Sequence, residues 1–355
     1  MATFAFADPA NALIRLLNSR ASGSPKGYAE AAAEVAGKAA EPNANPLYGY
    51  VLATVSLEKD APAEARLDDE TRRKYFDASR DKLFKLAKEK DNPLAWYLLS
   101  LESHDTNMLC HAAEKGNVQA LNAWGAYLIA TAAGNAMTTN EISAVMQKAY
   151  GYFNRAAGMG DANGLYNLGM CYAKGYGVEV DDQQAFNCFR SAAEKGHPEA
   201  INNIGWFFRE GRVVPRDLAL SAAWFAKSAG YRNIYGMFNY AVALENGEGV
   251  KKDVVLAASL MKHAADGGCI EAVNAYGVML GKGNGVKQDH VAAFRLFLRA
   301  AQAGYPPAME NLATCYETGR GVKADEALSM EWKIRSKAAR GDRNAIQWLR
   351  SKGRR

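Results

Sequence analysis

The chain lacks the long apolar run that a transmembrane helix needs. No stretch of its 355 residues approaches the roughly 18 consecutive apolar residues that indicate a membrane span. The N-terminal residues also lack the basic region and apolar core of a secretory signal. We therefore predict a cytoplasmic protein, or a periplasmic or secreted one if a leader has been trimmed away.

Cysteine is scarce and does not form a disulfide pattern. The chain has five cysteines, an odd number with no regular pairing, which favours a reducing compartment. Cys171 and Cys188 could face each other within one helical hairpin. Because cysteine is commonly buried as a small apolar residue, we interpret them as two buried thiols.

Catalytic and metal-binding motifs are missing as well. The five histidines have no zinc-type spacing with one another or with cysteines, and neither G-x-S-x-G nor HExxH occurs. Glycine triplets such as Gly283–Gly285 follow helical patterns rather than strands, so we interpret them as turns and not as phosphate-binding loops. The sequence thus predicts no catalytic residue, no metal and no cofactor.

What the chain does have is a repeat with a strict interval of 36 residues. A small residue marks each copy: Gly169, Gly205, Ala241, Gly277 and Ala313. Six positions later comes a glycine: Gly175, Gly211, Gly247, Gly283 and Gly319. Valine and aspartate then follow at further steps of three, ending in Asp181, Asp217, Asp253, Asp289 and Asp325. A fixed period of this length is typical of stacked repeat proteins.

Each copy is predicted to fold as a helix, a turn and a second helix. Residues 162–174 carry apolar side chains at i, i+3, i+4 and i+7, the pattern of an amphipathic helix. Gly175 can adopt the positive φ of a helix C-cap, and Asp181 is a suitable N-cap for the next helix. The small residue at 169 lets the second helix approach closely.

These features resemble the Sel1-like repeat, a relative of the tetratricopeptide repeat. The resemblance covers about residues 161–341, and a further copy at 117–160 fits through Trp124 and Gly125 with extra residues around 134–141. Val213 stands where the second glycine of the turn belongs, so we expect a distorted turn there. Ala241 and Ala313 replace the close-contact glycine, and in the last copy the closing glycine, Gly341, comes one residue late.

The resemblance implies an all-α fold, a right-handed α-solenoid of stacked antiparallel helix hairpins. We predict three parts of one continuous solenoid: 1–116 as an N-terminal cap with degenerate helical hairpins, 117–341 as the repeats, and 342–355 as a basic capping helix and tail. Within the first part, 9–41 is predicted to be a capping pair, 43–116 two hairpins, and 60–68 a loop.

The net charge of +5 is concentrated at the C-terminus. From Glu331 onward the chain has nine basic residues and only two acidic ones. Such a tail can attract nucleic acid or another anionic surface. Aromatic residues do not interleave with these charges, so we interpret the segment as a solvated capping helix and expect no nucleic-acid partner.

The first helices of the repeats carry the candidate binding residues. Three columns of positions outside the core stripe should face the groove of a tetratricopeptide-like stack. They hold apolar and aromatic side chains together with asparagines, which suit a protein interface and the backbone of an extended peptide. The predicted site is Tyr166, Asn167, Met170, Asn202, Asn203, Trp206, Tyr235, Phe238, Asn239 and Val242. The alternative is that the asparagines bond along the stack and the aromatics pack between repeats.

The resemblance implies a non-catalytic scaffold or adaptor that binds a protein or peptide partner in its concave groove. One alternative is an inhibitor or immunity protein that wraps a toxic enzyme, a role of some bacterial relatives. Another is an enzyme or an enzyme subunit. The oligomeric state is left open, with a monomer as the default.

Overall fold

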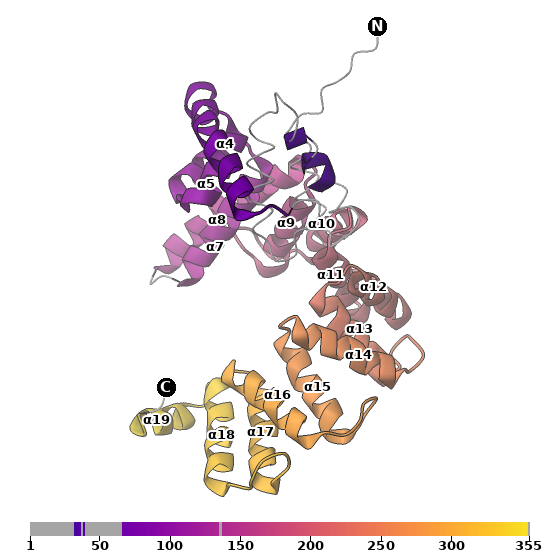
Figure 1. Ribbon diagram of the computed structural model, residues 1–355. Helices are drawn as coiled ribbons and strands as arrows, with labels where there is room; N and C mark the ends of the chain where they lie inside the picture. The colour runs from indigo at the N-terminus through magenta and orange to yellow at the C-terminus, as the bar shows by residue number, and fades with distance from the viewer. Residues whose placement is uncertain (1–31, 37, 40–65, 135–136, 354–355) are drawn as a thin grey trace. The chain divides into compact units, whose positions relative to one another are not determined.

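The structure is a computed structural model that describes residues 32–36, 38–39, 66–134 and 137–353. Every regular element within these ranges is a helix (Figure 1). Successive helices pack as antiparallel pairs, so the predicted α-solenoid of stacked hairpins is confirmed. The chain divides into two compact units, residues 1–204 and 205–355, each described by itself below.

Among its described residues, the first unit has helix at 32–36 and 38–39, three longer helices before the repeats, and two complete repeat hairpins. The three longer helices are α4 (Asp69–Lys90), α5 (Pro93–Ser103) and α6 (Thr106–Glu114). The hairpins are α7 (Val118–Gly134) with α8 (Thr139–Gly158), and α9 (Ala162–Lys174) with α10 (Asp182–Glu194). The predicted capping pair at 9–41 and most of the 60–68 loop lie largely outside the described residues.

The second unit begins within α11 (Pro198–Glu210) and ends with a short C-terminal helix. Between them lie α12 (Leu218–Gly230), α13 (Ile234–Asn246), α14 (Val254–Asp266), α15 (Ile270–Lys282), α16 (His290–Gln302), α17 (Pro306–Thr318) and α18 (Glu326–Ala339). The last helix, α19 (Arg343–Ser351), packs on α18 at the predicted capping position. We call α7, α9, α11, α13, α15 and α17 the first helices, and the even-numbered helices from α8 to α18 the second helices.

The repeated aspartate caps each of the five second helices from α10 to α18. Each accepts a hydrogen bond from the backbone N–H three residues later, at 2.9 Å in all five copies, from Asp181 to Asp325. An N-cap of this kind contributes about 1 kcal/mol to helix stability. The predicted caps are confirmed, and they fix where each second helix begins.

The small residue at the repeat marker makes room for one large side chain on the facing second helix. A Cβ placed on Gly169 would lie 2.7 Å from the Phe189 ring, and Gly277 has the same relation to Phe297. In the repeat with Ala241, the residue at the phenylalanine position is Met261, which is fully buried. A flexible thioether can adjust to the added methyl group. Ala241 therefore accompanies a change from phenylalanine to methionine at the facing position.

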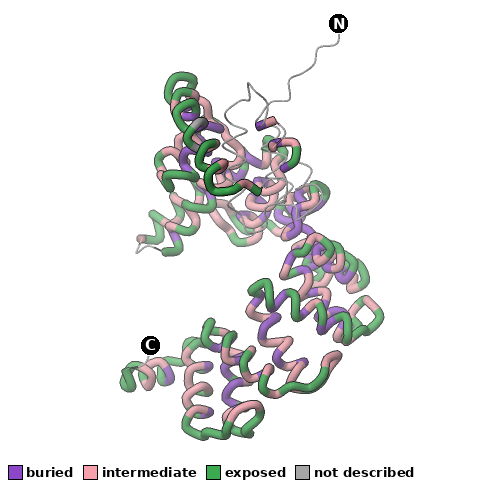
Figure 2. Tube along the Cα trace, in the orientation of Figure 1, coloured by how far each residue is buried: buried purple, intermediate pink, exposed green. Residues whose placement is uncertain are grey.

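The described core consists of two clusters in the first unit and a long one in the second, in all of which small and apolar side chains, alanine above all, are buried. In the second unit it runs through α13 to α17 and includes Leu244, Met261, Met279 and Leu312. Buried residues line the sides of the helices that face one another, whereas the turns are largely exposed (Figure 2). Alanine pairs such as Ala264 and Ala265 allow neighbouring helices to pack closely.

The expectation of a distorted turn at Val213 is wrong. Its φ of 68° matches the values of 71° and 69° at the equivalent Gly177 and Gly249. Valine thus adopts the left-handed backbone that the turn requires, although its branched Cβ disfavours that conformation. The turn geometry is preserved, and the cost appears as local strain instead of a changed path.

The extra residues in the 117–160 copy extend its helices. Helices α7 and α8 have 17 and 20 residues, compared with 13 in α9 and 13 in α10. Thr138 and Glu141 form a capping box at the start of α8, so the second helix begins well before the position of its counterparts. The insertion therefore lengthens this hairpin beyond its neighbours.

Candidate functional site

The predicted site residues of the first unit are held by contacts within that unit. The Tyr166 ring stacks on His197 with a centroid separation of 4.4 Å and lies 5.8 Å from the Phe189 ring. Met170 accepts a weak hydrogen bond from the Asn203 amide, with the nitrogen 3.9 Å from sulfur. The side chains of Tyr166 and Met170 are both half-buried. They therefore contribute to packing as well as to the surface of α9.

His197 supports this arrangement from the junction between α10 and α11. Its Nδ1 accepts a hydrogen bond from the backbone N–H of Ala200 at 3.3 Å, so it acts as an N-cap. Burial lowers the pKa of His197 to about 4. The Glu199 carboxylate lies 3.3 Å from the same nitrogen and could pair with it only if the ring were protonated. Since Nδ1 accepts the hydrogen bond from Ala200, the neutral ring would carry its proton on Nε2.

The asparagines connect neighbouring first helices. The Asn167 amide donates to Asn122 Oδ1 at 3.2 Å, which joins α9 to α7. The Asn311 amide donates to Asn274 Oδ1 at 2.8 Å, which joins α17 to α15. In both cases the donor comes from one column and the acceptor from the adjacent column of the preceding repeat. These two bonds run along the stack, from one repeat to the next.

Two further asparagines of the predicted site are almost completely buried. Asn202 is 7% exposed and Asn239 is 3% exposed. Buried amides normally form hydrogen bonds within the protein. Their amide groups therefore present little surface to a partner.

The aromatic residues of the second unit are much more exposed. Trp206 on α11 is 39% exposed and Tyr235 on α13 is 51% exposed. The Trp206 ring meets Phe225 edge-on at 6.1 Å, and the Arg209 guanidinium lies 5.2 Å from its centroid. Phe238 and Val242 are half-buried and pack against the core of this unit. Two large aromatic surfaces thus remain open on successive first helices.

The predicted set missed a cavity farther along the same columns. A cavity of about 250 Å³ lies among α15, α16 and α17, and its lining includes Val278, Asn311 and Thr314. Val278 and Thr314 occupy the column that holds Met170 and Trp206 in earlier repeats. The column changes from Met170 and Trp206 to the smaller Val242, Val278 and Thr314, and this run of smaller side chains was the available signal.

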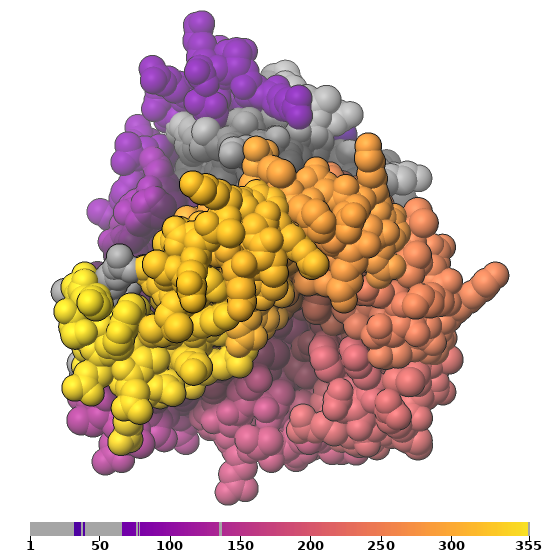
Figure 3. Space-filling model, turned by 90° about the horizontal axis from the view of Figure 1, so that it is seen from below, coloured from indigo at the N-terminus to yellow at the C-terminus, as the bar shows by residue number. Residues whose placement is uncertain are grey.

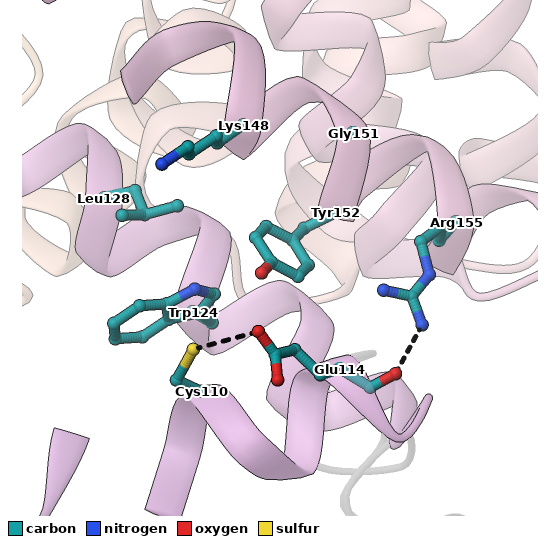
Figure 4. Close-up of a pocket in the computed structure, with 8 residues that line it drawn as sticks. All are labelled: Cys110, Glu114, Trp124, Leu128, Lys148, Gly151, Tyr152 and Arg155. Atoms are coloured by element: carbon teal, nitrogen blue, oxygen red, sulfur yellow. Dashed lines mark hydrogen bonds between the residues drawn. The ribbon is translucent and has the colours of Figure 1, made fainter. Parts of the chain in front are cut away.

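A second cavity, of about 490 Å³, lies in the first unit among α6, α7 and α8. Figure 4 shows Trp124 and Leu128 on one side, with Tyr152 and the cations Lys148 and Arg155 on the other. The Arg155 guanidinium donates to the backbone carbonyl of Glu114 at 3.0 Å, which ties α8 to the end of α6.

Two side chains of this second cavity, Cys110 and Tyr152, have pKa values above their usual range. Burial raises the pKa of the Cys110 thiol, and the nearby Glu114 carboxylate raises it further. Burial likewise raises the pKa of the Tyr152 hydroxyl. A thiol is a strong nucleophile only as the thiolate. The Cys110 thiol is therefore not activated as a nucleophile.

The described residues include no group of three or more histidine, cysteine, aspartate or glutamate side chains placed to hold a metal ion. All five cysteines are free thiols, and burial, followed by the neighbouring Cys188, raises the pKa of Cys171 to about 12. Among the described helices, none combines the length and the apolar character that crossing a bilayer requires.

Ion pairs neutralise part of the basic C-terminal segment. Arg340 pairs with Glu310 at 2.8 Å, Lys333 with Glu317 at 2.8 Å, and Arg335 with Glu331 at 2.8 Å. The first two pairs connect α18 or its end to α17. Two of the nine basic residues therefore pair with carboxylates of the neighbouring helix α17.

Comparison with known sequence families agrees with this repeat architecture. The sequence model of the Sel1 repeat matches residues 139–161, 162–197, 198–229, 234–269, 270–305 and 306–333. These six segments together cover more than half of the chain. No curated protein matches the chain.

Solved structures share the fold. The chain is similar to a protective antigen of uropathogenic Escherichia coli strains that displays an SLR fold, with 28% identity and a TM-score of 0.54. That match covers 70% of this chain and 52% of the antigen, so the chain spans about half the antigen's length. A Sel1 repeat protein from Oxalobacter formigenes is 26% identical with a TM-score of 0.56, over 63% of this chain and 88% of that one.

An immunity protein from Pseudomonas aeruginosa is more distant. It is 17% identical over 62% of this chain and 83% of that one, with a TM-score of 0.43. This likeness is too slight to indicate a shared role.

Proposed function

The chain belongs to the Sel1 repeat family, and from this premise we propose that it is a non-catalytic scaffold that binds a protein partner through its first helices. Sel1 repeats mediate protein–protein interaction, and the family generally lacks catalytic residues. The proposal places the main anchors on α11 and α13 of the second unit. It gives the residues of α9 a supporting part.

The observation that carries the proposal is the exposure of two large aromatic side chains on successive first helices. Tyr235 is 51% exposed and Trp206 is 39% exposed. Aromatic residues are over-represented among the side chains that dominate binding energy at interfaces. A contiguous exposed apolar patch on a folded domain commonly marks an interaction site. We therefore assign these two residues as anchors.

The surroundings of Trp206 suit an anchor. Phe225 supports one edge of the indole ring at 6.1 Å, and the Arg209 guanidinium lies 5.2 Å from its centroid. Arg209 is in turn held by an ion pair with Glu248 at 3.2 Å. A side chain already held in place loses less conformational entropy when a partner binds.

The remaining predicted residues support this face in a secondary way. Phe238 and Val242 present only part of their surface, because each also packs on the core. On α9, Asn167 donates one amide hydrogen to Asn122, and an amide has further donor and acceptor positions. Tyr166, Met170, Asn202, Asn203 and Asn239 are proposed to shape the first-helix surface rather than to anchor the partner.

The test is affinity capture from lysate of the source organism, with three versions of the protein as bait. These are the wild type, a double variant Trp206→Ala with Tyr235→Ala, and a control double variant Val255→Ala with Val291→Ala. The control residues are exposed by 66% and 49% and lie on the second helices α14 and α16. We expect a stoichiometric partner to be retained by the wild type and the control, with binding at least about tenfold weaker in the first-helix variant.

Thermal melting of each bait separates lost binding from lost folding. Both aromatic rings are substantially exposed, so we expect the double alanine variant to melt within a few degrees of the wild type, corresponding to about 1 kcal/mol. A partner held equally by all three baits would contradict the proposed face. Capture of no protein at all would contradict the scaffold function.

A further inference from the structure

The cavity among α15, α16 and α17 has an apolar floor and lies wholly in the second unit. Phe297 and Ala293 of α16, together with Val278 and Cys315 of the flanking first helices, provide that floor. Figure 3 shows part of the surface of these helices in orange and yellow. The volume of the cavity, about 250 Å³, is below the roughly 300–1,000 Å³ of pockets that bind drug-sized ligands. The size suits one large side chain.

One lining position of the cavity has no side chain. Gly281 lines it from the last turn of α15, where the equivalent residues of other repeats are Ala173, Arg209, Glu245 and Glu317. A Cβ at 281 would meet only Ala293 Cβ, at the ordinary contact distance of 3.8 Å. Packing therefore does not require glycine here, although glycine within a helix costs about 0.5–1 kcal/mol relative to alanine.

The rim of the cavity is positively charged. Lys282 and Arg320 line it, and Lys287 and Lys323 lie in the adjoining turns. All four are exposed, and none has a side-chain ion pair with another residue of the described ranges. The carboxylates of the same two turns, Asp289 and Asp325, cap α16 and α18.

His290 also lines the cavity, at the first position of α16. The nearby Glu317 carboxylate pairs with Lys333 at 2.8 Å, so it does not neutralise the rim. Cations therefore predominate around the opening.

We propose that this cavity, the α15–α17 pocket, receives one large apolar side chain from an acidic segment of the partner protein. The apolar floor accommodates the side chain, and the flanking carboxylates of the segment meet Lys282 and Arg320. The inference rests on the proposed function, since it names the charge of the partner and the location of a second anchor.

A protein segment fits this geometry better than a lipid surface. A bilayer is bound by apolar side chains that protrude into it and by basic residues around them. Here the apolar surface is recessed between three helices, so a partner must insert a side chain into the protein. Each carboxylate near a cation also favours fast, salt-sensitive association.

The test uses fluorescein-labelled acidic peptides whose central residue is leucine, isoleucine, methionine, phenylalanine, tyrosine or tryptophan. The comparison peptides have a central alanine, or lysines in place of the acidic residues. Fluorescence anisotropy measures affinity for the full chain at low and high salt. We expect at least one acidic peptide to bind about tenfold more tightly than its alanine form, and the basic peptides not to bind.

Two variants at one position locate the binding in the pocket. Gly281→Leu fills the cavity and should weaken the best peptide about tenfold or more, whereas Gly281→Ala adds one methyl group and should retain binding. Both should melt at or above the wild-type temperature, because each removes a helical glycine. Lys282→Gln with Arg320→Gln should weaken binding and reduce its salt dependence.

Several outcomes would overturn the inference. These are equal binding of the alanine peptide, no binding of any acidic peptide, equal binding by Gly281→Leu, or binding of vesicles of anionic phospholipid without binding of the peptides. Affinity capture with the same variants distinguishes failure of this inference from failure of the proposed function. A partner lost from Trp206→Ala with Tyr235→Ala but retained by Gly281→Leu would leave the scaffold function standing and remove only the pocket.

Discussion

At the scale of single residues, the turn after α11 adopts a conformation that its sequence disfavours. Val213 has a φ of 68°, and it is 41% exposed, so its side chain gains little from burial. A left-handed backbone costs a non-glycine residue roughly 1–2 kcal/mol, whereas the greater freedom of glycine in the unfolded chain returns about 0.5–1 kcal/mol. We expect Val213→Gly to raise the free energy of unfolding by about 1 kcal/mol, measured by thermal and urea denaturation.

The reciprocal change is the matched control. Gly249 occupies the same turn position in the next repeat, and a Cβ there would collide with the carbonyl oxygen of Leu218. Gly249→Val should therefore lower the melting temperature. If Val213→Gly left stability unchanged or reduced it, the left-handed valine would not be strained.

The buried His197 predicts a loss of stability in mild acid. Its pKa is about 4 in the folded protein against 6.5 for an exposed histidine, so between these values the unfolded chain binds more protons. The contribution of the neutral ring to the free energy of unfolding should be fully present above about pH 6.5. It should be lost as the pH falls towards 4, by at most about 3 kcal/mol. The Glu199 carboxylate, 3.3 Å away, would partner the protonated ring and reduce the loss.

His197→Asn is the variant that isolates this titration. Asn233 occupies the equivalent position one repeat later and caps α13 by accepting from the Gly236 backbone N–H at 2.8 Å. The substitution keeps an N-cap but removes the ionisable ring. Urea denaturation between pH 4 and pH 8 should show a flatter pH dependence for the variant than for the wild type. Parallel curves would mean that His197 does not contribute to the acid loss.

At the scale of elements, the close approach of the two helices in a hairpin depends on a matched pair. A Cβ on Gly125 of α7 would lie 2.6 Å from the ring of Phe153 on α8, which is 2% exposed. We expect Gly125→Ala to destabilise the protein by about 1–2 kcal/mol, because overpacking outweighs the gain in helix propensity.

A double-mutant cycle tests whether the pair acts as a unit. The natural combination of Ala241 with Met261 suggests that Phe153→Met relieves the clash introduced by Gly125→Ala. We expect the double variant to be more stable than the sum of the single effects by about 1 kcal/mol or more in urea denaturation. Additive effects would show that the alanine is accommodated in another way.

Local patterns allowed most of the hairpin architecture to be predicted. The N-cap at Asp181 and the positive φ at Gly175 follow from residue chemistry within one turn, so the sequence alone indicates them. The length of α8 was not predictable in the same way, because a helix can extend into a segment that the repeat pattern treats as a loop.

The candidate site was harder to predict because exposure depends on neighbours in other repeats. Tyr166 belongs to the same kind of column as Phe238, yet it stacks on His197 from the following junction. The Asn167 amide is directed along the stack to Asn122 of the preceding repeat. The α15–α17 pocket is lined by Gly281 and by small side chains of α15 and α17, and a search for large apolar or polar residues passes over such positions.

At the scale of the whole molecule, contacts between neighbouring helices provide most of the tertiary structure. In the second unit α14 packs on α15, α15 on α16, and α16 on α17, and each hairpin repeats the geometry of the one before. The stability of such an array is approximately the sum of the repeats and of the interfaces between neighbours. A complete repeat can therefore be removed if the register of the remaining helices is kept.

Deleting residues 270–305 is the direct test, because this segment is one full repeat and joins α14 to α17 in register. We expect the shortened protein to keep its helix content per residue by circular dichroism and to unfold cooperatively at a lower temperature, since one hairpin and one interface are lost. Deleting residues 276–305 instead fuses the helices out of phase and should abolish the cooperative transition of the second unit. If the protein with the in-register deletion lost its cooperative transition as the out-of-phase variant does, the second unit would need contacts that only its full length provides. The single repeat would then not be the unit of stability.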